Sequence, residues 1–208
     1  MTKIKICGMT CENDIHYANE YLPDYVGFVL YFPKSRRNIS METARHLLKM
    51  LRPEIKSVAV VVSPDKEQVK KITAAGFDQI QIHGMMTEEV YREIKIPILR
   101  AFNVSDLSSF SEYEKKEKIT GYVFDSKKPG SGKTFDWNQV IPLRKKGTKK
   151  IFLAGGIDET NVKKAMREVK PDVIDLSSAV ERPDVNGKCG GKDPEKMKII
   201  IRMVHDEK

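Results

Sequence analysis

Apolar residues along this chain gather in short runs, and each run is followed by a stretch with the spacing of a helix. The first run, residues 3–7, alternates apolar and polar side chains, which is the period of a β-strand. Lys5 and Cys7 share one face of that strand, and two isoleucines share the other. The second run, residues 25–30, is apolar throughout, as expected for a strand that is covered on both faces.

Six more runs continue the alternation of expected strands and helices. These further strands are expected at residues 57–62, 79–84, 98–104, 121–125, 151–156 and 172–177. Helices are expected at residues 14–21, 41–51, 64–75, 87–95, 105–118, 137–145, 159–169 and 194–204. Ser40 and Asp136 stand at N-cap positions, and Ser63 followed by Pro64 fits the start of the third helix.

The eight strand-and-helix units repeat about every 25 residues and predict the fold class. Strands that alternate with helices pair in parallel through right-handed crossovers. Eight units close a (β/α)8 TIM barrel, and 208 residues lie near the lower limit of that α/β fold, roughly 200. A doubly wound open sheet is the alternative, although it normally has fewer strands and a clear nucleotide fingerprint. No Pro/Gly/Ser-rich linker divides the chain, so we expect one catalytic domain over residues 1–208.

Composition and charge narrow the possible partners. A formal charge of +8 suggests an anionic partner, but the basic residues are scattered and have few aromatic residues among them to stack bases. A phosphorylated metabolite fits a modest positive field equally well, and we expect no nucleic-acid partner. No apolar run reaches membrane-spanning length and no signal peptide opens the sequence, so we expect no membrane partner. Three cysteines without framework spacing indicate a reducing, cytoplasmic setting.

Chemically useful residues stand at the carboxyl ends of the expected strands. These are Cys7, His83, Asp125, the pair Gly155 and Gly156, and the pair Ser177 and Ser178. In a closed barrel all of these ends meet at one mouth, although they are far apart in sequence. This convergence argues against the plainer interpretation of Cys7 as a small buried hydrophobic residue, the usual fate of a free cysteine.

The loops after the seventh and eighth strands are expected to hold a phosphate group. Barrels of this kind most often bind phosphate there, and glycines let the backbone N–H groups approach the anion. Residues 130–134 (GSGKT) look like a P-loop, but that pattern needs a glycine where Lys127 stands. We therefore expect a mobile loop over the mouth there, with Lys133 able to approach an anion.

Two further side chains carry candidate roles at this mouth. Asp125 shares a face with Val123 and Gly121, which suits a carboxylate that points into the barrel and acts as an acid or base. Arg37 ends a basic loop and has the planar fork that binds a carboxylate. Cys7, Cys11 and His83 are too few for a metal site, so we expect no metal.

At this point the sequence resembles the phosphoribosylanthranilate isomerase family of tryptophan biosynthesis. The motifs that carry the resemblance are residues 5–10 (KICGMT), 32–37 (FPKSRR), 81–84 (QIHG), 124–126 (FDS), 130–137 (GSGKTFDW), 153–157 (LAGGI) and 175–181 (DLSSAVE). They occur in order over nearly the whole chain. Ala179 stands where the family usually has glycine, and the stretch 184–191, which carries Cys189, is longer than usual.

The resemblance implies a cofactor-free Amadori rearrangement of N-(5'-phosphoribosyl)anthranilate to its 1-deoxyribulose isomer. It implies that Asp125 is the general acid that opens the furanose ring and that Cys7 is the general base that removes the C2' proton. Arg37 would hold the anthranilate carboxylate, and the loops at Gly155 and Ser177 would hold the phosphate. The remaining strand-end residues, His83 and Asp175 among them, would contact the substrate.

Lys5 adds an expectation that comes from the residues themselves. It stands two residues before Cys7 on the same strand face, where an ammonium group would favour the thiolate. A buried lysine needs a partner, and Asp175 on the neighbouring eighth strand is the candidate. The plainer alternative is that Lys5 only fills an interior layer.

The same residues bear on two competing functions. Another phosphosugar isomerase or epimerase on this barrel is the alternative, although a metal-dependent epimerase would need several inward histidine and acidic ligands. A nucleic-acid module would need clustered charge with stacking aromatics. We expect a monomer or a homodimer that acts on a small phosphorylated substrate.

Overall fold

The computed structural model describes residues 1–103, 110–126, 135–146, 149–184 and 189–206. The strands are β1 Lys3–Cys7, β2 Tyr25–Leu30, β3 Asn38–Ile39, β4 Lys56–Val62, β5 Gln79–His83, β6 Ile98–Asn103, β7 Ile119–Asp125, β8 Lys150–Leu153 and β9 Val173–Leu176. The α-helices are α1 Glu12–Tyr21, α2 Met41–Met50, α3 Lys66–Ala74, α4 Glu88–Glu93, α5 Phe110–Glu114, α6 Ile141–Lys146, α7 Val162–Val169 and α8 Pro194–His205. Two 3-10 helices, η2 Trp137–Gln139 and η3 Ser178–Val180, complete the set within these ranges.

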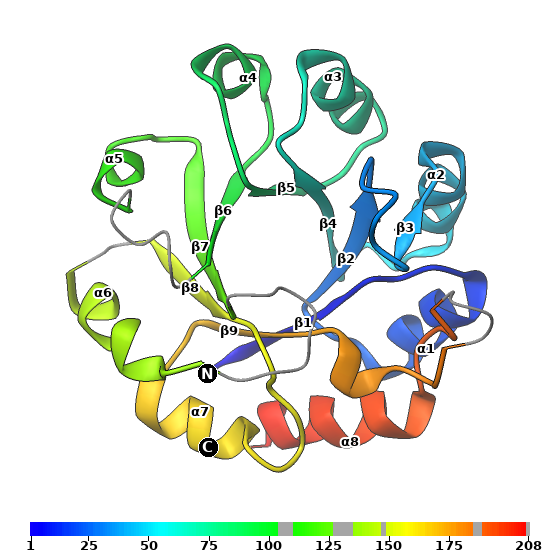
Figure 1. Ribbon diagram of the computed structural model, residues 1–208. Coiled ribbons are helices and arrows are strands. Elements are labelled where there is room, and N and C mark those ends of the chain that lie inside the picture. The colour runs from blue at the N-terminus through cyan, green and yellow to red at the C-terminus, as the bar shows by residue number, and fades with distance from the viewer. Residues whose placement is uncertain (104–109, 127–134, 147–148, 185–188, 207–208) are drawn as a thin grey trace.

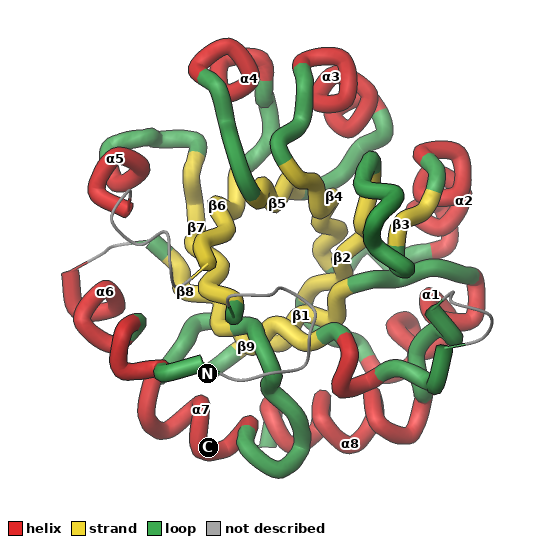
Figure 2. Tube along the Cα trace, viewed as in Figure 1, coloured by secondary structure: helices red, strands yellow, loops and turns green. Residues whose placement is uncertain are grey.

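The long strands form a closed parallel barrel, with the helices arranged as a ring outside it (Figures 1 and 2). The ring closes because β1 pairs in parallel with β9 on one side and with β2 on the other. The predicted α/β barrel is therefore confirmed. The two-residue β3, which the sequence pattern did not predict, pairs with β2 outside the ring.

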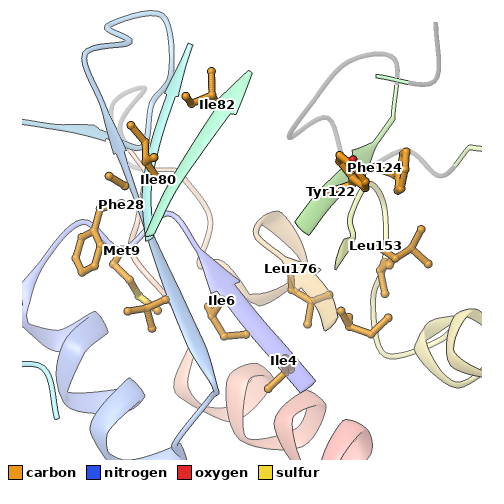
Figure 3. Packing of buried hydrophobic residues seen from close by; sticks show 14 of the residues in the cluster. Ile4, Ile6, Met9, Phe28, Ile80, Ile82, Tyr122, Phe124, Leu153 and Leu176 are labelled. Atoms are coloured by element: carbon orange, nitrogen blue, oxygen red, sulfur yellow. The ribbon is translucent and has the colours of Figure 1, made fainter. Parts of the chain in front are cut away.

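Two apolar cores follow from the alternation along each strand. The outer core lies between strands and helices and includes Ile4, Ile6, Phe28, Leu153 and Leu176 (Figure 3). The inner core fills the barrel with Tyr25, Val58, Val60, Leu99, Val123 and Phe152 among others. Lys5 and Cys7 point inward with this second set, as the period of the first strand predicted.

The starts of two helices, α2 and α3, test the predicted N-caps. Ser40 accepts a hydrogen bond from the Thr43 amide and caps α2, as predicted. The expected start of the third helix at Ser63 and Pro64 is wrong, because Asp65 caps α3 through a capping box with Gln68. Ser63 instead adopts a left-handed conformation with φ of 46°.

Two other predicted helices differ from the structure, and one short element was not predicted. The helix expected over residues 105–118 is observed only as the short α5, Phe110–Glu114, and residues 104–109 are outside the described ranges. The helix expected at residues 137–145 is divided into η2, which Asp136 caps, and α6. An antiparallel bridge between Glu181 and Lys192 in the last loop was not predicted. Among the described residues, we find no helix that is long and apolar enough to cross a membrane.

Candidate active site

A cavity of about 640 Å³ opens at the mouth formed by the carboxyl ends of the strands. All the residues that the sequence analysis selected line it, namely Cys7, Arg37, His83, Asp125, Gly155, Gly156, Asp175, Ser177 and Ser178. The closed barrel brings these residues together, although they are spread over the sequence from residue 7 to residue 178. The predicted loop at residues 130–134, with Lys133, lies outside the described residues.

Asp125 ends β7 with its carboxyl group largely buried in the cavity wall. Its Oδ1 accepts a hydrogen bond from the Ser126 amide at 2.7 Å. Burial raises the pKa of Asp125 to about 6, and the charge of Asp175 adds to the effect, while the Ser126 amide opposes it. A carboxyl group with this pKa holds a proton over part of the neutral pH range, which is what a general acid requires.

Gly155 makes room for this carboxyl group. A Cβ atom at that position would lie 2.6 Å from the Ser126 nitrogen and 2.9 Å from the Asp125 Oδ1, both too close for a side chain. Its φ of +82° also favours glycine. The glycine that the sequence analysis assigned to phosphate binding is therefore also needed for the packing of Asp125.

Cys7 ends β1 with its thiol at the cavity wall, beside Gly27 of the neighbouring strand. A Cβ atom on Gly27 would come within 2.8 Å of the Sγ atom, so the glycine provides space for the thiol. Burial raises the pKa of Cys7 above its ordinary value, although the positive charges of Lys5, Lys192 and Arg37 oppose the rise. Lys5 acts on this pKa in the expected direction, because its ammonium lowers it, but burial outweighs that effect and the net shift is upward.

Lys5 is fully buried inside the barrel beneath the cavity. Its Nζ donates to Oδ2 of Asp175 at 2.6 Å and to Oε1 of Gln81 at 2.8 Å, so the predicted pairing with Asp175 is confirmed. Burial favours the neutral amine and is the largest single effect, but the charges of Asp175 and Cys7 together with their hydrogen bonds raise the pKa of Lys5 above its ordinary value. The second oxygen of Asp175, Oδ1, is buried without a hydrogen-bond partner among the described residues. It is therefore available as an acceptor for a ligand hydroxyl.

His83 ends β5 and lies between the cavity and the buried polar residues Lys5 and Gln81. Its Nε2 lies 2.8 Å from the Nε2 of Gln81. Burial, with the positive charges of Lys5 and Arg100, lowers the pKa of His83 to about 4. The imidazole is therefore neutral near pH 7.

Arg37 lines the cavity, and part of its guanidinium is hydrogen-bonded to Glu181. Its Nε donates to Oε1 of Glu181 at 2.6 Å, and its Nη2 donates to Oε2 at 2.9 Å. Burial opposes ionisation of Glu181, but its hydrogen bond from Arg37 and the charge of Lys192 lower its pKa to about 2. A guanidinium has five N–H donors, and within the described residues none of the hydrogen bonds of Arg37 uses Nη1, so that end can bind an incoming carboxylate.

Lys192 is a functional candidate that the sequence analysis missed. It is fully buried, and its Nζ donates to the carbonyl oxygen of Cys7 at 2.6 Å, to that of Ser177 at 3.3 Å and to Oε1 of Glu181 at 3.0 Å. Glu181 belongs to the motif at residues 175–181, which gave a sequence signal for it. Lys192 follows a polar, glycine-containing loop, and nothing in that composition signals burial.

The expected phosphate loops lie side by side at one edge of the cavity. Gly155 and Gly156 both have positive φ, and Ser178 begins η3. The hydroxyl of Ser177 is engaged, since it donates to the Cys7 carbonyl at 3.0 Å. Any contact of Ser177 with an anion would therefore come from its main chain.

Comparisons with known proteins agree with this arrangement. The sequence profile described as N-(5'phosphoribosyl)anthranilate (PRA) isomerase matches residues 4–203. The N-(5'-phosphoribosyl)anthranilate isomerase of Clostridium kluyveri is 41% identical over 212 residues, with 100% of both chains covered.

Two solved structures share the fold over nearly the full length. One, with a TM-score of 0.83 and 31% identity, contains monomers derived from the dimeric phosphoribosylanthranilate isomerase of Thermotoga maritima and covers 99% of this chain and 100% of that one. The other is a phosphoribosyl anthranilate isomerase in complex with reduced 1-(o-carboxyphenylamino)-1-deoxyribulose 5-phosphate. It has a TM-score of 0.83, 30% identity and the same coverage.

Proposed function

The chain belongs to the N-(5'-phosphoribosyl)anthranilate isomerase family, and we propose that the cavity at the barrel mouth carries out this isomerisation with Asp125 as acid and Cys7 as base. The reaction is the Amadori rearrangement of N-(5'-phosphoribosyl)anthranilate to 1-(2-carboxyphenylamino)-1-deoxyribulose 5-phosphate, the third step from chorismate toward tryptophan. The observation that carries the assignment is that a proton-holding carboxyl group and a thiol line the same cavity between an arginine and a glycine- and serine-rich edge.

Two anionic anchors orient the substrate in this proposal. The free Nη1 end of Arg37 binds the anthranilate carboxylate, while Glu181 fixes the other side of the guanidinium. The backbone at Gly155, Gly156 and Ser178, after β8 and β9, binds the phosphate. Holding both ends places the sugar carbons between acid and base, and positioning of this kind can contribute several kcal/mol to the rate.

Ring opening comes first. The carboxylic acid of Asp125 gives its proton to the furanose oxygen while the bond from that oxygen to C1' breaks. The electron pair on the anthranilate nitrogen forms a double bond to C1', which leaves an iminium ion and an ionised Asp125. The pKa of about 6 is suited to this step, because the acid is partly protonated near neutral pH.

Proton abstraction follows at C2'. The iminium makes the C2' proton acidic, the Cys7 thiolate removes it, and the electrons form a C1'=C2' double bond while the nitrogen regains its pair. A proton gained at C1' and one lost from the C2' hydroxyl then give the ketone, and Cys7 and Asp125 return to their starting states. Asp175 supports the sugar through its unpartnered Oδ1, and His83 contacts the sugar from β5.

The assembly state is a separate part of the proposal. A monomer or a homodimer is expected, and the dimeric relative from Thermotoga maritima supports the homodimer as one of these states. Size-exclusion chromatography with light scattering distinguishes the two.

Turnover of phosphoribosylanthranilate in the presence of EDTA tests the assignment. The wild-type protein should form the ketone, Cys7→Ala should lose the activity, and Asp125→Asn should lose most of it. Cys11→Ala is the matched control, because Cys11 is an exposed cysteine in the following loop. Normal activity of Cys7→Ala, or equal loss in Cys11→Ala, would contradict the role given to Cys7.

A further inference from the structure

Gln81 is a buried amide on β5 that the reaction described above does not use. It is 3% exposed and stands two residues before His83, on the same inward face of the strand. Its Oε1 lies 2.8 Å from the Nζ of Lys5, and its Nε2 lies 2.8 Å from the Nε2 of His83. The amide therefore bridges the buried ammonium and the imidazole at the cavity.

The donor and acceptor roles in this bridge follow by elimination. An ammonium group has only donors, so the atom of Gln81 that faces Lys5 must be the carbonyl oxygen. Lys5 remains an ammonium because the carboxylate of Asp175 contacts it at 2.6 Å. The other end of the amide is then the NH2 group, which can only donate, so the Nε2 of His83 must be the acceptor.

An imidazole that accepts at Nε2 is neutral and carries its proton on Nδ1. The groups around His83 agree with a neutral ring, because the charged neighbours that act on it, Lys5 and Arg100, are both positive. Arg100 donates to the carbonyl oxygens of Ile82 and Gly84, on either side of His83 in the chain. Within the described residues, no protein acceptor takes a hydrogen bond from Nδ1, and the ring lines the cavity.

We propose that Gln81 is a positioning residue that holds His83 in the Nδ1–H tautomer, so that His83 donates a hydrogen bond to a substrate oxygen. In this arrangement the charge of Asp175 fixes Lys5, Lys5 fixes the orientation of the amide, and the amide fixes the tautomer. The donation to substrate rests on the proposed function, whereas the tautomer does not.

The tautomer can be read directly in the ligand-free protein. Long-range proton–nitrogen correlation NMR on uniformly 15N-labelled protein distinguishes protonated from unprotonated ring nitrogens, and His83→Asn identifies the signal among the four histidines. We expect Nδ1 protonated and Nε2 unprotonated at pH 7. A ring with its proton on Nε2, an imidazolium, or an even mixture of tautomers would overturn the proposal.

Substitution of Gln81 gives the causal test. In Gln81→Glu the NH2 donor becomes an acceptor, so the proton of His83 should move to Nε2. Gln79→Glu is the matched control, because it makes the same change two residues earlier on the strand, and no hydrogen bond between Gln79 and His83 is found among the described residues. An unchanged tautomer in Gln81→Glu, or the same change in Gln79→Glu, would show that Gln81 does not set it.

A second variant covers the case in which Gln81→Glu does not fold. Gln81→Met removes both polar ends and should leave His83 as a mixture of tautomers. Its KM for phosphoribosylanthranilate should rise about five-fold, the worth of one neutral hydrogen bond. A wild-type KM beside a mixed tautomer would refute the donation to substrate. A wild-type protein without isomerase activity would instead count against the proposed function, and the NMR result would stand separately.

Discussion

Replacing Asp125 with asparagine should stabilise the protein while removing most of its activity. Asp125 is 9% exposed, and burial together with the charge of Asp175 raises the pKa of its carboxyl group from 3.8 to about 6. The fold therefore disfavours the ionised form relative to the unfolded chain. Asparagine has nearly the same shape, and its Oδ1 can still accept the 2.7 Å hydrogen bond from the Ser126 amide.

The size of the stabilisation follows from this pKa. A rise of about two pKa units corresponds to about 3 kcal/mol of free energy between the two protonation states. An uncharged amide does not carry this penalty, so the free energy of unfolding should increase by up to that amount. For a chain of this length, such a change raises Tm by roughly 6 to 12 °C.

The stability that Asp125→Asn gains over the wild-type protein should increase with pH. Below about pH 4 the carboxyl group is neutral in the folded and unfolded states, and the substitution should have little effect on stability. Between about pH 4 and pH 6 the unfolded chain ionises before the folded one, so the wild-type protein loses stability as pH rises. Above that range the penalty is constant, and the advantage of the asparagine variant is complete.

Urea denaturation at pH 8 and at pH 4, with kcat measured on the same samples, checks both halves of the prediction. The kcat should fall by roughly 10²- to 10⁴-fold, the usual contribution of general acid–base catalysis. Asp136→Asn is a suitable control, because asparagine caps a helix as well as aspartate does. No gain in stability at pH 8 would refute the burial argument. A variant equally inactive on an already opened, open-chain substrate would refute the role in ring opening.

Three further predictions concern the groups around the cavity. Arg37→Ala should weaken substrate binding by roughly 1.5–3 kcal/mol, the range for a hydrogen bond to a charged group, and an unchanged KM would remove Arg37 from the site. The kcat/KM should rise with pH as Cys7 ionises, with a kinetic pKa above the ordinary value of a thiol. Lys5→Met should raise that kinetic pKa further, and an unchanged kinetic pKa would contradict the role of Lys5. Lys192→Met should lower kcat more than it raises KM, because it frees the Cys7 carbonyl, and a wild-type kcat would show that this contact is only structural.

The fold was predictable because its signal repeats along the chain. Each strand has a run of apolar residues, and each helix has the periodic spacing of a helix. Errors in the predicted end of one element therefore did not change the number of strand-and-helix units. The errors came from local competition. Ser63 and Pro64 look like a helix start, but Asp65 with Gln68 forms two reciprocal hydrogen bonds and takes the cap. A two-residue strand such as β3 is too short to show the alternation of apolar and polar residues from which strands are predicted.

The site was predictable to the extent that its residues stand at strand ends. Cys7 and Asp125 lie where parallel strands present their last side chains, and barrel closure alone brings them to one cavity. The sign of the pKa shift at Cys7 was not predictable, because it depends on how much of the thiol is buried. The burial of Lys192 could not be predicted either, because it depends on a loop folding back onto the first strand.

That loop has a consequence for the order in which a newly made chain becomes an enzyme. During synthesis, Cys7 leaves the ribosome long before β9 can pair with β1 or Lys192 can reach the Cys7 carbonyl, because both follow it by more than 160 residues. Domains generally fold as units as the chain emerges. The thiol, the arginine and the acid are therefore all present on an incomplete chain that lacks the contacts holding them in place. Activity should appear in one late step, when the final unit closes the barrel, rather than grow with the length of the nascent chain.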